Sequence, residues 1–406
     1  MSDSKRAPLA LRMDVIAESA TLRLNALVNE LRAQGKPVIN LTAGEPDFAV
    51  PAPVKQAVAD AMAANRSKYT ATAGIPELRA LIAEKTNRQQ PGLEKPWTAS
   101  DVIVSNGGKQ AIFNALFCTV NPGDEVVIVS PYWLSYPEMV KLVGGVPKVV
   151  RTTAESGFKM SPAQLEAALT DRTRMVIWNS PSNPTGATYT REEYARLGEV
   201  ILRSPWRDQI WSLSDEIYDC ITFGTGGFAS FLGAVPALRE RGVTVNGMSK
   251  SAAMTGWRIG WSVAPAALTR VIDRLQGQTT SGINALAQWA SVAGLKLPEK
   301  HFADQLTVYR RRRDLALETL RKSGKIKIST PEGAFYFFLG VESALRPGED
   351  SVPFAERLLQ EAGVAVVPGV SFGEPGWIRI SFATDEKSLQ EGCERLVAFI
   401  EKGSQA

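Results

Sequence analysis

The chain has few of the residues on which several common chemistries depend. Its 406 residues include one histidine, His301, and three cysteines, Cys118, Cys220 and Cys393, which are far apart in the sequence. This scarcity argues against a Cys/His metal site and against a Ser–His or Cys–His catalytic relay. No apolar run reaches the about 18 residues that a membrane-spanning helix needs. The polar N-terminus lacks the apolar core of a signal peptide, so we expect a cytoplasmic protein with no membrane association.

The chain also lacks a large excess of charge of one sign. The formal net charge is +4, and basic residues are interspersed with acidic ones. The densest basic cluster, Arg310 to Arg313, lies in a helical pattern and is interpreted as a solvated helix face. Nucleic-acid binding is therefore not expected. The composition is typical of a globular protein, and the length predicts two domains rather than one compact core.

From Asp101 onward, short apolar strands alternate with helices. The predicted strands cover residues 102–105, 124–130, 148–151, 175–178, 210–213 and 243–246. This alternation predicts an α/β fold in which helices cover both faces of a largely parallel sheet. Right-handed crossovers place the C-terminal ends of the strands at one rim, where ligands bind. The polar segments that follow these strands are therefore expected to meet there.

The pattern changes after about residue 295. A long helix is predicted over 299–322, and shorter helices over 352–361 and 386–401. Strands are predicted at 326–328, 334–339, 364–367 and 377–382. This mixture predicts a smaller α+β domain.

Lys250 lies in residues 245–261, a segment rich in glycine, serine and alanine. Lysine forms Schiff bases and changes its pKa readily when it is desolvated. Taken alone, however, the segment favours a lysine on a loop with its amine in water. The other polar segments decide between the two interpretations.

Each of these segments has both a functional and an ordinary interpretation. Residues 106–110, Asn-Gly-Gly-Lys-Gln, begin a predicted helix and could bind a phosphate or simply form a turn. Asp215 ends an apolar strand, where it would need a cationic partner or would cap a helix. Asn183 lies between prolines, in a turn that could fix its side chain or be an ordinary Asx turn. Arg258 could hold a phosphate, and Arg379 could hold a carboxylate or pair at the surface.

A lysine in a confined setting, an acid for a pyridinium nitrogen, a phosphate cradle and a carboxylate-binding arginine together describe one cofactor, pyridoxal 5'-phosphate. From about residue 20 to about residue 400 the chain resembles the fold-type I, class-I aminotransferases that depend on this cofactor. The motifs are Ser-Pro-Ser-Asn-Pro-Thr-Gly at 180–186, Ser-Asp-Glu-Ile-Tyr at 214–218, and Ser-Lys followed by Met-Thr-Gly-Trp-Arg-Ile-Gly within 249–260. In combination they are far more specific than any one motif.

The resemblance implies a fold, a domain division and an assembly. We expect a large domain with a mostly parallel seven-stranded sheet covered by helices, and a smaller α+β domain built from both termini. Residues 1–48 would form an N-terminal lid and part of the small domain, 49–294 the large cofactor-binding domain, and 295–406 the small C-terminal domain. We also expect a homodimer with active sites at the interface.

The resemblance also implies residue roles. Lys250 would form the Schiff base with the cofactor and act as the catalytic base. Asp215 would pair with the pyridine nitrogen. The other expected cofactor contacts surround the ring and the phosphate: Gly108, Lys109, Trp133, Asn183, Tyr218, Ser249 and Arg258, with Tyr69 reaching the phosphate from the partner subunit. The expected substrate contacts are Gly44, Lys109, Trp133, Asn183 and Arg379, of which Arg379 and Gly44 would hold the α-carboxylate. No metal is expected.

Four segments, 42–48, 107–112, 130–136 and 364–369, are similar to a bacterial aspartate aminotransferase branch of this family. In that branch the lysine of Gly-Gly-Lys-Gln, here Lys109, helps to bind the distal carboxylate of aspartate, and Ser19-Ala-Thr21 matches a segment that closes over the site. The resemblance implies amino transfer from L-aspartate to 2-oxoglutarate by a ping-pong cycle. Ala17 stands where members that use prephenate often have a basic or polar residue, which weakens that alternative.

Other functions on the same fold stay open. The preferred donor could be an aromatic amino acid, arginine or another amino acid, and a carbon–sulfur or carbon–carbon lyase is a further alternative. A cofactor-binding transcriptional regulator would carry a DNA-binding domain before the matching region. Since the match begins near residue 20, we expect an enzyme instead.

Overall fold

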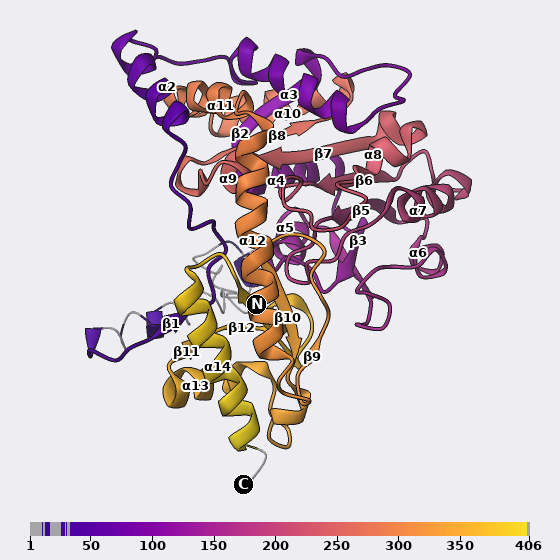
Figure 1. Cartoon of the computed structure of the whole chain (residues 1–406). Coiled ribbons are helices and arrows are strands. Elements are labelled where there is room, and N and C mark those ends of the chain that lie inside the picture. Colours follow the sequence, from indigo (N-terminus) through magenta and orange to yellow (C-terminus); the bar gives the residue numbers. More distant parts are fainter. Residues whose placement is uncertain (1–9, 11–12, 17–25, 29, 31–32, 404–406) are drawn as a thin grey trace, which may run out of the picture.

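A seven-stranded, mostly parallel sheet forms the larger part of the computed structural model, which describes residues 10, 13–16, 26–28, 30 and 33–403 (Figure 1). The strands, in spatial order, are β2 (Val102–Asn106), β8 (Ile259–Val263), β7 (Gly242–Gly247), β6 (Trp211–Asp215), β5 (Thr173–Asn179), β3 (Glu125–Ser130) and β4 (Val146–Arg151). Strand β8 runs in the direction opposite to that of the other six strands of this sheet. The predicted α/β fold is confirmed.

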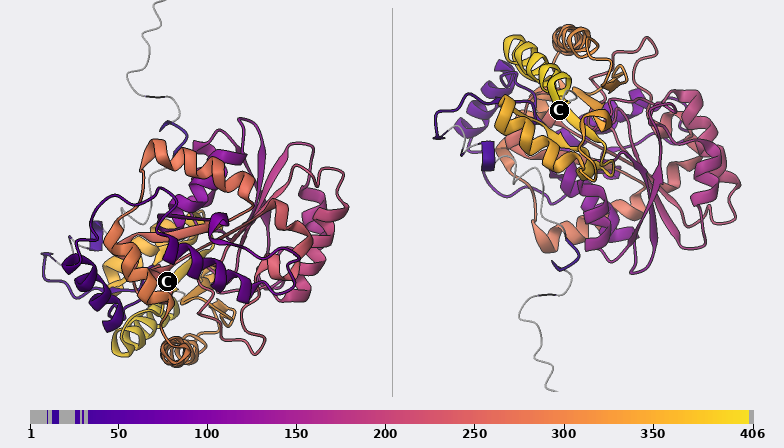
Figure 2. Two further views of the ribbon diagram at one scale, coloured as in Figure 1. Left: turned by 90° about the horizontal axis from the view of Figure 1, so that it is seen from above. Right: turned by 90° about the horizontal axis from the view of Figure 1, so that it is seen from below.

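Helices cover both faces of this sheet (Figure 2). Val104, Val127 and Val176 point into one apolar layer, whereas Ile103 and Ile177 point into the other, because successive side chains of a strand alternate between faces. The first layer includes α2 (Ala52–Ala63), α3 (Pro76–Gln89), α6 (Pro162–Ala168), α7 (Arg191–Arg203), α8 (Phe231–Ala234) and α11 (Ala285–Leu295). The second includes α4 (Gly107–Thr119), α5 (Ser135–Leu142) and α10 (Ala266–Thr279).

A smaller sheet, built around a separate core, follows in the C-terminal part of the chain. Its antiparallel strands are β12 (Val367–Pro368), β13 (Trp377–Ser381), β10 (Tyr336–Gly340) and β9 (Lys327–Ile328). Beside it, β1 (Ile39–Asn40) pairs in parallel with β11 (Val364–Ala365), so an N-terminal segment joins the C-terminal part. The helices of this part are α12 (Glu299–Leu320), α13 (Ser351–Ala362) and α14 (Glu386–Gly403). Helix α12 extends from the large sheet to the small sheet (Figure 1).

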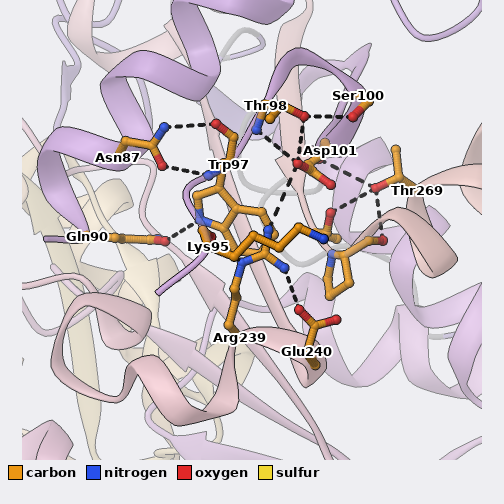
Figure 3. Close-up of polar contacts among 12 residues, drawn as sticks. Asn87, Gln90, Lys95, Trp97, Thr98, Ser100, Asp101, Arg239, Glu240 and Thr269 are labelled. Carbon is orange, nitrogen blue, oxygen red and sulfur yellow. Dashed lines mark hydrogen bonds and ion pairs between the residues drawn. The ribbon is translucent and has the colours of Figure 1, made fainter. Parts of the chain in front are cut away.

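A polar cluster fills the rim at the N-terminal ends of β2 and β7 (Figure 3). The guanidinium of Arg239, in the 3-10 helix Pro236–Arg241, stacks 3.9 Å from the ring centroid of Trp97. Arg239 Nε donates to the carbonyl of Lys95 (2.7 Å), and Trp97 Nε1 donates to Gln90 Oε1 (2.7 Å). The chain's own side chains thus occupy this rim.

The six predicted strands of the large sheet and the long helix α12 are confirmed within a few residues. Strand β8 and helices α10 and α11 were not predicted, and the single strand predicted at 364–367 is divided into β11 and β12. The apolar spacing of residues 22–34 predicts a further helix, and this segment falls largely outside the described residues. Within the described part of the chain, no helix combines the length and the apolar sequence that crossing a membrane requires.

Candidate active site

A cavity of ≈ 570 Å³ lies at the rim where the parallel strands end. Its lining contains all the predicted site residues except Tyr69: Gly44, Gly108, Lys109, Trp133, Asn183, Asp215, Tyr218, Ser249, Lys250, Arg258 and Arg379. Tyr69 lies in the loop between α2 and α3 with 98% of its surface exposed, so this chain does not bring it into its own cavity.

Strand direction explains why these side chains meet. Asp215 is the last residue of β6, and Lys250 lies in the short helix α9 (Met248–Ser251) directly after β7. Helix α4, which carries Lys109, directly follows β2. Arg258 precedes β8, and because β8 runs in the opposite direction, its first residue lies at the same rim.

Asp215 provides a buried carboxyl group at one side of the cavity. The Tyr136 hydroxyl donates to its Oδ2 (2.7 Å), and the backbone N–H of Ile217 donates to its Oδ1 (3.3 Å). Burial raises the pKa of Asp215 to about 6, although both hydrogen bonds oppose this change. At neutral pH the group is therefore mostly ionised and can accept a hydrogen bond from a cationic ligand.

Lys250 provides an amine in the same cavity. Its Nζ donates to the carbonyl of Gly44 and lies 5.9 Å from the ring centroid of Tyr218. Although the side chain opens onto the cavity, desolvation lowers its pKa to about 8, and the charge of Arg379 acts in the same direction. Near neutral pH an appreciable fraction of this amine is unprotonated and able to act as a nucleophile or base.

The N-terminus of α4 and Arg258 form an anion-binding corner. Arg258 donates to the carbonyls of Thr255 (2.9 Å) and Asn106 (3.3 Å), both of which are neutral acceptors. Its backbone is left-handed (φ 58°), which is uncommon for a residue with a side chain. A helix N-terminus with a guanidinium beside it suits a phosphate group.

Two glycines allow this close approach. A Cβ on Gly107, whose φ is +82°, would lie 2.5 Å from Arg258 Nη2. A Cβ on Gly260 would lie 2.2 Å from the backbone nitrogen of Gly108. Only glycine at both positions lets β8 and its arginine lie against the first turn of α4.

Lys109 adds a further cation to the lining of the cavity. Its Nζ lies 4.9 Å from the ring centroid of Trp133, within the range of a cation–π contact. Desolvation lowers the pKa of Lys109, and the nearby charge of Arg258 adds to this effect. The lysine is therefore a point charge available to a second anionic group.

Arg379 comes from the small sheet and is almost completely buried, with 5% of its surface exposed. Its Nη1 donates to Asn183 Oδ1 (2.9 Å) and its Nη2 to the carbonyl of Thr42 (2.8 Å). Its Nε is buried without a partner, and both of these acceptors are neutral. A buried guanidinium with no carboxylate counter-charge in the described structure favours a carboxylate ligand.

Several cavity residues were not predicted: Asn40, Thr42, Glu45, Tyr136, Asn179, Thr255 and Tyr336. Tyr136 lies in the 130–136 motif, and the need of a buried Asp215 for a donor was a usable signal. Tyr336 lies in an apolar run that predicts only a core strand, so no local signal distinguished it. The predicted lid residues Ala17 and Ser19 to Thr21 lie outside the described residues.

These groups fit pyridoxal phosphate. A buried carboxylate, an amine with a lowered pKa and an anion-binding corner face one cavity, in the combination that the ring nitrogen, aldehyde and phosphate of this cofactor require. Among the described residues, no group of three or more histidine, cysteine, aspartate or glutamate side chains is arranged to hold a metal ion.

Comparison with known proteins agrees with this site. Residues 36–396 match the family model "Aminotransferase class I and II". The chain is 44% identical over 401 residues to an aspartate/prephenate aminotransferase of Cereibacter sphaeroides, covering 96% of this chain and 99% of the relative. The crystal structure of the Rhizobium meliloti aspartate aminotransferase superimposes with a TM-score of 0.91 at 40% identity, covering 97% and 98% of the two chains. Aspartate aminotransferase from Thermus thermophilus with maleate gives a TM-score of 0.88 at 41% identity, covering 96% and 99%. The chain therefore belongs to the class I and II aminotransferase family.

Proposed function

We propose that this protein binds pyridoxal 5'-phosphate and transfers the amino group of L-aspartate to 2-oxoglutarate, giving oxaloacetate and L-glutamate by a ping-pong mechanism. The observation that carries the proposal is the position of Lys250 in one cavity with buried Asp215 and with the buried guanidinium of Arg379, whose two hydrogen-bond acceptors among the described residues are neutral. Membership of the family and the names of the relatives support it.

The cofactor, when bound, supplies the electron-withdrawing ring that makes the substrate Cα–H acidic. Lys250 Nζ would hold the cofactor and would move the proton to and from the substrate carbon. Asp215, oriented by Tyr136, holds the proton of the ring nitrogen in place. Ser249, the first turn of α4 and Arg258 bind the phosphate, while Trp133, Asn183 and Tyr218 position the ring.

Two cations at different places in the cavity account for a dicarboxylic substrate. Arg379 binds the α-carboxylate, assisted by Asn183 and by the chain at Gly44. Lys109 attracts the distal carboxylate as a point charge, without the bidentate geometry of an arginine. We infer a preference for aspartate with a tolerance of other donors.

The assembly and domain division are proposed on structural grounds. Tyr69 is too exposed to serve its own cavity, which supports a homodimer in which it reaches the phosphate of the partner's site. The pairing of β1 with β11 supports a small domain built from residues 1–48 and 295–406, around a large domain of residues 49–294. We place the protein in the cytoplasm.

The test combines turnover with cofactor absorbance. The purified protein should show a visible absorbance band, and L-aspartate alone should shift that band as the amino group is transferred to the cofactor. Lys250→Ala should lose the wild-type band and turnover. Normal activity and absorbance in this variant would contradict the proposal, and a lyase would release products without 2-oxoglutarate.

Substrate preference is tested by a screen of amino donors with 2-oxoglutarate. Lys109→Ala should raise the KM for aspartate about tenfold or more, but change that for an apolar amino acid less, because one charge contact is lost. Lys300→Ala, which removes an exposed lysine on α12, is the matched control. Equal effects of Lys109→Ala on both donors would remove the argument for a dicarboxylate.

Prephenate is a second candidate amino acceptor. The Cereibacter sphaeroides relative, at 44% identity, is named for both aspartate and prephenate. The same screen, run with glutamate or aspartate as donor and prephenate as acceptor, decides whether this activity is present.

A further inference from the structure

Tyr336 connects two parts of the cavity that belong to different sheets. It is the first residue of β10 in the small sheet and is completely buried. Its hydroxyl lies 2.8 Å from the hydroxyl of Tyr218, which follows β6 of the large sheet. The guanidinium of Arg379 lies 4.3 Å from the ring centroid of Tyr336.

Strand register fixes this arrangement. Tyr336 is paired with Ser381 in the antiparallel ladder of β10 and β13, and Arg379 lies two residues from Ser381 on the same face. Diagonal neighbours of this kind are within reach of aromatic and long side chains. The arginine therefore stacks on the tyrosine ring, and only the hydroxyl of Tyr336 points to Tyr218.

The two phenols share one hydrogen bond, so one of them donates and the other keeps its proton for another partner. Burial raises the pKa of Tyr336, but the charge of Arg379 opposes this rise. Burial raises the pKa of Tyr218 well above its ordinary value, and the charge of Arg379 opposes that rise as well. The geometry allows either hydroxyl to donate, and donation by Tyr336 is the arrangement that leaves the proton of Tyr218, whose ring centroid lies 5.9 Å from Lys250 Nζ, for a ligand in the cavity.

We propose that Tyr336 is a positioning residue that donates to the Tyr218 hydroxyl, so that Tyr218 directs its own proton into the cavity, and that it links this geometry to Arg379. The proposal deepens the function proposed above and rests on it. Tyr218 would then be oriented by Tyr336, whose ring also stacks against Arg379.

The test uses Tyr336→Phe in the holoenzyme, which keeps the ring beneath Arg379 and removes only the hydroxyl. We expect kcat for aspartate to fall about threefold to tenfold, the effect of one lost hydrogen bond. The dissociation constant of maleate, measured by the absorbance of the bound cofactor, should change less than about twofold because the arginine and its stacking contact remain. The absorbance maximum should move in the direction seen for Tyr218→Phe.

A double-mutant cycle separates positioning from general structural damage. In the Tyr218→Phe background, Tyr336→Phe should have no further effect on kcat, because Tyr336 acts through the lost hydroxyl. The matched control is Tyr309→Phe, which removes a buried hydroxyl that has no partner. It should leave kcat and absorbance unchanged.

The outcomes are distinct. If the wild type binds the cofactor and is active, but Tyr336→Phe leaves kcat and absorbance unchanged or adds to Tyr218→Phe independently, the positioning role is wrong. If the wild type shows neither the absorbance band nor transamination, the proposed function itself fails.

Discussion

Glu216 follows Asp215 in the chain but is absent from the cavity lining, and its side chain is almost completely buried. Its Oε1 accepts hydrogen bonds from Ser214 (2.9 Å) and Ser230 (2.7 Å), whereas its Oε2 is buried without a partner. Burial raises the pKa of Glu216 to about 7, although the two serines oppose this rise. The nearby Asp219 adds to the rise, and Lys85, which is paired with Asp219, opposes it.

Glu216→Gln keeps the shape and removes the titration, so its effect on stability depends on pH. Below the ordinary glutamate pKa of 4.5, Glu216 is protonated in both the folded and unfolded states and has no electrostatic effect. As pH rises from there to about 7, only the unfolded state ionises, so the wild type loses stability relative to the variant. The pKa difference of about 2.5 corresponds to a loss of about 3 kcal/mol, complete above pH 7.

The assay is thermal unfolding of wild type and variant with saturating cofactor at several pH values between 4.5 and 8.5. We expect similar Tm values near pH 4.5, and a variant more stable by several degrees at pH 8. Glu166→Gln, which removes a carboxylate from an exposed side chain, controls for the loss of one charge. A Tm difference that does not change with pH would refute the protonated state of Glu216.

Three further predictions concern the cavity. Gly260→Ala should weaken cofactor binding about tenfold or more in a fluorescence titration, because its Cβ would lie 2.2 Å from the backbone nitrogen of Gly108; unchanged affinity would contradict the close packing. Arg379→Lys should raise the KM about tenfold to a hundredfold through loss of the planar fork, and equally for acidic and apolar donors, since both share the α-carboxylate; an effect on one donor alone would contradict this role. Asp215→Asn should lower kcat at least a hundredfold with the cofactor still bound, measured at a saturating cofactor concentration; near-normal kcat would show that the buried charge is not needed.

The fold could be predicted wherever the spacing of apolar residues and the length of the apolar run indicate the same kind of element. Short apolar runs separated by helical patterns specified the parallel strands, which are buried on both faces. Strand β8, Ile-Gly-Trp-Ser-Val, gave a weaker signal because a glycine interrupts its apolar run. Its place beside β2 brings Gly260 against Gly108, a contact between residues far apart in the chain that no local pattern indicates.

Most of the candidate site could be predicted from residue type and position, because Asp215, Lys250 and Arg258 lie at or next to strand ends at one rim of the large sheet. Arg379 lies within β13 of the small sheet and was predicted from the resemblance. Of the connecting residues, Tyr136 could have been found from the need of buried Asp215 for a donor, whereas Tyr336 could not. Tyr136 and Tyr336 act through one hydroxyl each, and their rings are packed like those of other core aromatics. A tyrosine in an apolar run therefore has no local feature that separates a site residue from a core residue.

The two sheets have separate apolar cores, yet the cavity requires groups from both. Asn183 and Tyr218 belong to the large sheet and meet Arg379 and Tyr336 of the small sheet through hydrogen bonds of 2.9 and 2.8 Å. Tyr218 also packs edge-on against Phe335 and Tyr336 in the core of the small sheet, so apolar contacts cross the boundary and help to set how Arg379 faces the cofactor-binding side. Polar contacts across the boundary contribute to that alignment, and each is individually weak. Substrate geometry is therefore expected to be more sensitive to these hydroxyl and amide groups than overall stability is.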